Sequence, residues 1–165
     1  MVLATAAATR GAYHTDVKVN QVVKATGVGT DFAVGLVTYM DPADDTFKTA
    51  PTTNAFAPFG VVVNKRPATT DTKMDNALGG HVVVEADGAI APGNYVAVSG
   101  ATAGTVVEYA VTGSPTAGTA STELRRIVGR YIGKATGNER DGVTIASAAD
   151  GDLIWVELGL GQGGL

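Results

Sequence analysis

The chain of 165 residues contains no cysteine, two histidines and one tryptophan, and only 6% of its residues are aromatic. Without cysteine it cannot form disulfides, thiolate-based zinc sites or a cysteine nucleophile. With so few aromatic side chains it cannot build a large aromatic core. Its stability must therefore come from the packing of small aliphatic side chains or from partner proteins.

Charge is also scarce, because charged residues make up 17% of the chain, with 12 basic and 16 acidic side chains, a net charge of -4 and a pI near 5.0. An acidic balance gives little electrostatic support for nucleic-acid binding. No apolar run approaches the roughly 20 residues that span a bilayer, and the N-terminus lacks the pattern of a signal peptide. We therefore expect a protein partner, with no nucleic acid, no membrane and no export signal.

Small and β-branched residues dominate what is present. The chain has 26 alanines, 22 glycines, 22 valines and 21 threonines, which together exceed half of its length. Valine and threonine favour pleated, half-buried surfaces, and the glycines with 6 prolines supply turns. This composition predicts an all-β fold with little helix, arranged as a compact β-barrel or β-sandwich.

Alternating or continuous apolar runs bounded by turn residues predict nine strands. They are Val17–Lys24, Phe32–Met40, Phe59–Asn64, His81–Ala86, Tyr95–Ser99, Thr105–Val111, Arg126–Lys134, Val143–Ala146 and Asp152–Leu158. Residues 41–51 read as a turn, residues 67–80 as a loop with a short turn at 73–78, and residues 112–121 as a surface loop. Residues 122–131 could also form a helix, but Gly129 and the β-branched residues favour a strand there.

The chain divides into an extended N-terminal arm (1–16), a first β-repeat (17–88), a second β-repeat (89–160) and a glycine-rich tail (161–165). The two repeats align faintly but in order. The aligned pairs are 32–37 with 90–96, 44–47 with 103–106, 59–65 with 128–134, and 83–85 with 155–157. The offset grows along the alignment, and most of the extra residues fall in the 112–121 loop, where insertions are tolerated. These correspondences predict a duplicated β-unit.

Residue patterns for catalysis are missing from the sequence. His14 and His81 stand apart, with no spacing that could assemble a metal site. The few serines, Ser99 among them, lie outside any nucleophile motif. We therefore expect a protein that is not an enzyme and holds no metal and no cofactor. An enzyme with dispersed residues would require a pocket with perturbed acids or bases.

Seven residues are candidates for contacts with a capsid or a sister subunit. Arg126 and Arg130 would share a strand face, either as a solvated face or as a polar contact strip, because arginine makes forked bonds to carboxylates. Trp155 is a candidate for a core or intersubunit anchor. The remaining four candidates belong to the arm: Val2, Leu3, Tyr13 and His14.

Three segments between Gly88 and Leu158 carry a resemblance to a known family. They are Gly88–Val96, with the pattern G-x-I-x-x-G-x-x-V, then Ile132–Gly133, and Gly151–Leu158, with the pattern GD-x-I-x-V-x-L. In this pattern the chain resembles the small bacteriophage proteins that decorate or cement capsids. The first repeat, from Gly35 to Ala86, resembles the lambdoid head decoration proteins more loosely.

The resemblance implies a non-catalytic structural protein of the virion, located on the capsid exterior. Its partners would be the major capsid protein and itself, commonly as a homotrimer, and it would hold neighbouring capsomers together after shell expansion. Because this chain is longer than the smallest members and doubled, another stoichiometry is open. In this hypothesis the arm or the strand edges pair with neighbouring chains. The alternative is a phage tail, fibre or adhesin-type module that binds a host surface or glycan.

Overall fold

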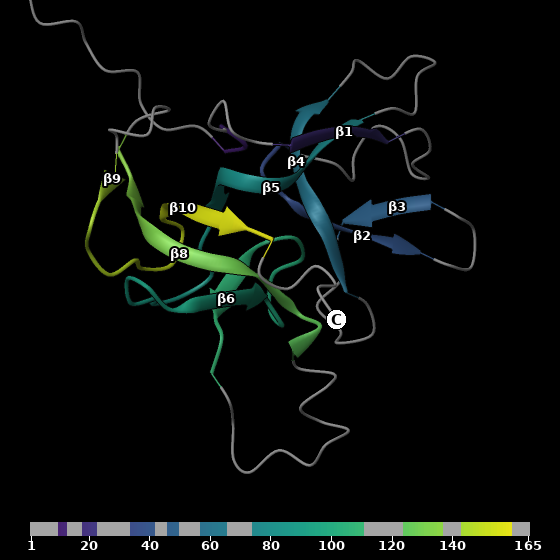
Figure 1. Cartoon of the computed structure of the whole chain (residues 1–165). Helices are drawn as coiled ribbons and strands as arrows, with labels where there is room; N and C mark the ends of the chain where they lie inside the picture. Colours follow the sequence, from purple (N-terminus) through teal and green to yellow (C-terminus); the bar gives the residue numbers. More distant parts are fainter. Residues whose placement is uncertain are drawn as a thin grey trace, which may run out of the picture.

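The computed structural model describes residues 10–12, 18–22, 34–41, 46–49, 57–65, 74–110, 124–136 and 143–159. Their regular structure is almost entirely β-strand (Figure 1). The strands are β1 (Lys18–Val22), β2 (Val37–Asp41), β3 (Thr46–Thr49), β4 (Pro58–Lys65), β5 (Met74–Glu85), β6 (Tyr95–Val98), β7 (Val106–Glu108), β8 (Ile127–Ala135), β9 (Val143–Thr144) and β10 (Leu153–Leu158). The predicted all-β class is confirmed.

Two segments predicted as turn and loop are strands instead. β3 lies inside the segment predicted as a turn. Its strand-forming residues make a short run directly after aspartates, which favour turns, so the local pattern did not predict a strand. The first half of β5 falls in the predicted loop, because its Asp, Asn and Gly residues have low strand propensity. Pairing with β4 on one edge and β1 on the other overrides that propensity. For residues 127–131 the preference for strand over helix is confirmed, since β8 begins at Ile127. Just before β8, Leu124 is helical, and Arg125 and Arg126 form a turn.

The strands form one sheet in the order β3-β2-β4-β5-β10-β8-β6-β7, with β1 added beside β5 and β9 beside β8. The two ends of this order approach each other. The amide of Val37 in β2 donates to the carbonyl of Gly104, just before β7, at 2.9 Å. A Cβ on Gly104 would lie only 2.8 Å from Cγ2 of Thr49 in β3. The sheet therefore curls into a nearly closed barrel.

The strand order reads the same from both ends, with β3-β2-β4-β5 matching β7-β6-β8-β10. The pairing registers match as well, including a β-bulge at the same place in each half. In β2 and β4 the partners are Val37–Val61, Thr38–Gly60 and, beyond the bulge, Tyr39–Pro58. In β6 and β8 they are Tyr95–Arg130, Val96–Gly129 and, beyond the bulge, Ala97–Ile127. The correspondence of β4 with β8 agrees with the sequence alignment. In β2 and β6 the register matches Val37 with Tyr95, one residue earlier than the alignment, which matches Val37 with Val96.

The last aligned segment differs from the observed register. In the first half, β5 pairs with β4 through Asp75, Asn76 and Ala77, with one bulge between them. In the second half, β10 pairs with β8 in the same way through Trp155, Val156 and Glu157. The sequence alignment had matched Val83–Glu85 with that stretch of β10. The difference arises because the second half carries β9 and its flanking residues between β8 and β10, which lengthens the offset.

The core is built from aliphatic side chains of both halves. Most of its members are valines with no exposed surface, such as Val61, Val82 and Val156, packed around the buried ring of Tyr131. Equivalent positions on the two halves have different burial. Val37 and Val61 are fully buried, whereas their register equivalents Tyr95 and Arg130 face solvent. One face of the second half is therefore left open on the molecular surface.

Candidate functional site

Four of the seven predicted contact residues, Val2, Leu3, Tyr13 and His14, lie outside the described residues. The described part of the predicted arm, residues 10–12, pairs with its own chain. Gly11 donates its amide to the carbonyl of Val83, and Val83 donates its amide to the carbonyl of Ala12, both at 2.8 Å. Arg10 forms an ion pair with Glu85 at the end of β5. These three residues therefore belong to the folded domain.

Arg126 secures the start of β8 against β6. Its guanidinium donates to the carbonyl of Val98 at 2.5 Å, and its own carbonyl accepts from the amide of Val98 at 3.1 Å. Arg126 precedes β8, and a bulge lies between it and Arg130. The simple alternation that would put both arginines on one face therefore does not apply.

Arg130 lies in a polar row that crosses four strands. Register pairs join Tyr95 in β6 to Arg130 in β8, Arg130 to Glu157 in β10, and Glu157 to His81 in β5. Register partners lie on the same face of a sheet, so these four side chains form one line, which we call the transverse row. The guanidinium of Arg130 binds the carboxylate of Glu157 at 2.7 Å.

The transverse row is accessible to a partner. The Tyr95 side chain is 47% exposed, and the side chains of Arg130 and Glu157 are 51% and 35% exposed. It offers an aromatic ring and an arginine on rigid strands, two groups that are enriched at protein interfaces, with an anion beside them. Sequence reasoning found only Arg130, because strand partners far apart in the chain cannot be identified without the register.

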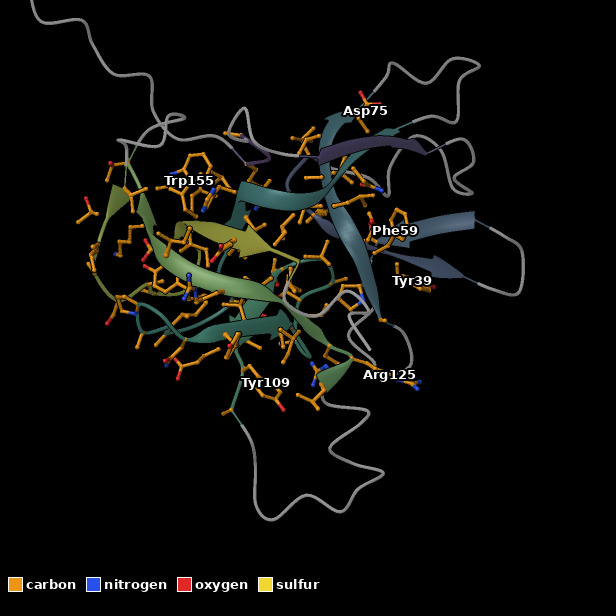
Figure 2. The ribbon with its side chains drawn as sticks, viewed as in Figure 1. Tyr39, Phe59, Asp75, Tyr109, Arg125 and Trp155 are labelled. Carbon is orange, nitrogen blue, oxygen red and sulfur yellow. The ribbon has the colours of Figure 1, made fainter. Side chains whose placement is uncertain are left out.

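Trp155 is buried within the single chain, with 1% of its surface exposed, and lies toward the upper left of Figure 2. Its partners across the sheet are Val83 in β5 and Gly133 in β8. Gly133 is itself covered, since a Cβ there would lie 2.7 Å from the carbonyl oxygen of Thr144. Among the described residues the indole Nε1 has no hydrogen-bond partner. In this fold the tryptophan therefore packs inside the molecule.

A second polar cluster surrounds Ser99, which follows β6. The buried hydroxyl of Ser99 donates to the carboxylate of Asp87, and its oxygen accepts from the amides of Ala101 and Thr102 at 2.9 and 3.1 Å. The hydroxyl of Ser99 lowers the pKa of Asp87 below its usual 3.8, partly offset by burial. These contacts stabilise the turn before β7 and connect it to Asp87. The Ser99 hydroxyl therefore has a structural role.

A third cluster holds the loop that precedes β10. Lys134 in β8 lies 2.7 Å from the carboxylate of Asp152, which also accepts from the amide of Ala149 at 2.6 Å. The hydrogen bond from Lys134 lowers the pKa of Asp152, and the Ala149 amide adds to this effect. Tyr131 donates its hydroxyl to the carbonyl of Ala146 at 2.5 Å, and burial raises its pKa. The cluster links β8 to the chain entering β10.

The edges of the sheet differ in how they are covered. At β7, the carbonyl of Val106 accepts from the amide of Asp87 at 2.7 Å, and Ala86 forms a parallel bridge with Val106. In the part of the chain that the structure describes, no strand lies beyond β3.

Within the described ranges, no group of three or more His, Asp or Glu side chains lies close enough together to hold a metal ion. The same residues include no helix long and apolar enough to cross a membrane. Comparison with protein-family models gives no match, and comparison with curated protein sequences gives no significant match.

Proposed function

We propose that this chain is a non-catalytic structural protein of a bacteriophage virion, which binds the capsid exterior and cements neighbouring capsomers. Its partners in this proposal are the major capsid protein and further copies of itself, with a trimer as the first stoichiometry to test. Binding would need no chemical step, since a shell offers many identical sites and modest contacts add up over them.

The observation that carries the proposal is the placement of the three sequence segments that resemble capsid decoration proteins. Gly88–Val96, Ile132–Gly133 and Gly151–Leu158 are separated in the chain, yet they contribute to β6, β8 and β10, which are neighbours in the sheet. Gly88, Gly93 and Gly151 all adopt positive φ angles, which explains why glycine is required at these turns. The resemblance thus corresponds to one continuous structural unit.

Two features of the described surface suit binding to a shell. The transverse row presents Tyr95, Arg130 and Glu157 on three rigid adjacent strands. Among the described residues β3 is the last strand of the order, and a strand of a neighbouring chain could be added beyond it. Shape and backbone pairing would then provide the attachment, with the row fixing its orientation.

The proposal is tested by separating a lysate of the source on a density gradient and detecting the chain with an antibody. We expect the chain to migrate with particles in hundreds of copies per particle. A few copies per particle would assign it to a tail or fibre, and recovery only in the slow soluble fractions would overturn a role in the virion.

Exchanging the two charges of the transverse row tests its part in binding. The variant with Arg130→Glu and Glu157→Arg retains one cation facing one anion across β8 and β10 but inverts their order on the surface. We expect unchanged stability and weaker binding to particles. As a matched control, Lys134→Arg keeps an ion pair with Asp152 away from the row and should leave binding unchanged. Equal binding of both variants would exclude the row from the contact.

A further inference from the structure

β5 is twice as long as its neighbour β10, with 12 residues against 6. β10 pairs with Gly80–Glu85, and β4 occupies the opposite edge along Met74–Ala77. β1 pairs with Met74–Gly79 and therefore lies end to end with β10 along the same edge of β5. We call the part of β5 that pairs with β1, Met74–Gly79, the docking edge. β1 fills the part of the β5 edge that β10 is too short to reach.

β1 is an addition to the sheet in two respects. It has no counterpart among the strands that correspond between the two halves. Its only strand partner in the described structure is β5, and no described strand covers its other edge. Figure 1 shows β1 at the upper border of the sheet. Its attachment therefore rests on one backbone ladder, the type of contact by which separate strands are added to a sheet.

The docking edge contains a buried polar side chain, Asn76, which has no exposed surface. Within the described part of the chain, neither its amide nitrogen nor its amide oxygen has a hydrogen-bond partner. It lies between Val62 of β4 and its register partner Asn20 of β1. A buried amide that loses water without gaining a hydrogen bond opposes the assembly that buries it. This cost lowers the net stability of the sheet at the place where β1 attaches.

We propose that the docking edge is an exchange site, at which β1 of a second copy of this chain replaces the chain's own β1. A strand taken from an identical chain makes the same ladder, so exchange changes few contacts and links two copies. The inference deepens the proposed function, because copies crowded on a shell would be joined in this way. Its test uses purified chains without particles, so the two proposals can fail separately.

The absence of cysteine makes the test direct, since any introduced cysteine is the only one in its chain. Gln21 and Asp75 are register partners across β1 and β5, and Figure 2 shows Asp75 at the end of the sheet near β1. Chains with Gln21→Cys are mixed with chains with Asp75→Cys at high concentration and oxidised. A disulfide between them requires the two positions to approach closely, as paired strands do. Mass spectrometry of the product identifies the mixed dimer.

The matched control mixes Gln21→Cys with Asp150→Cys, because Asp150 is exposed in the loop between β9 and β10. A second register pair, Val22→Cys with Met74→Cys, guards against one variant failing to fold. We expect both register pairs to yield several times more mixed dimer than the control, rising with protein concentration. Mixed dimer at the control level for both register pairs would overturn the exchange. Migration with particles would then still support the proposed function.

Discussion

Gly35 and Gly93 hold equivalent turns in the two halves of the barrel, and each has a φ of 86°. The amide of Gly35 donates to the carbonyl of Val62 at 2.7 Å, and the amide of Gly93 donates to the carbonyl of Tyr131 at 2.9 Å. Each turn leads directly into the strand that pairs with the acceptor strand. The two halves therefore share turn geometry as well as strand order and register.

Replacing these two glycines with alanine separates backbone strain from crowding. Gly93→Ala should lower the free energy of unfolding by about 1–2 kcal/mol, because alanine is strained at positive φ but meets open space there. Gly35→Ala should cost more, because its Cβ would also lie 2.5 Å from Cβ of Arg10. Urea unfolding of both variants measures the difference. Equal losses would contradict the packing of Arg10 against this turn.

Substitution of a glycine by alanine should destabilise the protein much more in β8 than in β5. At Gly129 a methyl group would overlap the carbonyl oxygen of Glu157 and crowd Val156. Gly129→Ala should therefore destabilise the protein by about 1–3 kcal/mol. At Gly79 a methyl group meets nothing within 4 Å, so Gly79→Ala serves as the matched control and should be close to neutral. Thermal unfolding would refute this packing if the control lost as much stability as Gly129→Ala.

Asp152 should contribute to stability at neutral pH and lose that contribution in acid. Its pKa in the folded chain lies below the ordinary 3.8, so as pH falls the unfolded chain takes up the proton first. Stability from this carboxylate is complete above about pH 4 and declines as pH falls through the lower folded-state pKa. Carboxyl-carbon NMR titration should show the pKa of Asp152 rising in Lys134→Met. Lys134→Arg keeps a cation beside Asp152 and should largely retain the low pKa. An unchanged pKa of Asp152 in Lys134→Met would show that Lys134 does not lower it.

Truncation of the N-terminus should show a sharp boundary at residue 10. Deleting residues 2–9 leaves the two hydrogen bonds to Val83 and the ion pair of Arg10 with Glu85 intact, so the free energy of unfolding should hardly change. Deleting residues 2–12 removes these contacts and should cost about 1–3 kcal/mol, since two hydrogen bonds are lost. Circular dichroism during urea unfolding compares the two. A large loss already in the shorter deletion would place essential contacts before Arg10.

The all-β class was predictable because valine and threonine dominate and turn glycines recur between apolar runs. Strands with strong local patterns, such as Val82–Val84 in β5 and Ile154–Val156 in β10, were located correctly. The start of β5 was missed because Asp75, Asn76 and Gly79 have low strand propensity. Their strand conformation comes from pairing with β4 and β1 on both edges, which is a property of the tertiary fold.

The candidate surface was only partly predictable, because strand register brings together residues that lie far apart in the chain. Arg130 was predicted as a candidate because it lies in the predicted strand 126–134, although the bulge removes the expected alternation with Arg126. Tyr95 and Glu157 were not predicted, since no local sequence pattern indicates that they pair with Arg130. Trp155 was singled out as a core or intersubunit anchor, and the described fold places it inside the chain. Its register partner Gly133 is identified only from the pairing of β10 with β8.

The most direct test of the central claim is the heat resistance of particles with and without the chain. Particles of the source are stripped of the chain with mild denaturant, replenished with purified chain, and heated while release of nucleic acid is followed by dye fluorescence. If the chain cements the shell, replenished particles will open at a higher temperature than stripped particles, and the increase will saturate with bound copies. Failure of the chain to rebind, or identical opening temperatures at full occupancy, would contradict a cementing role.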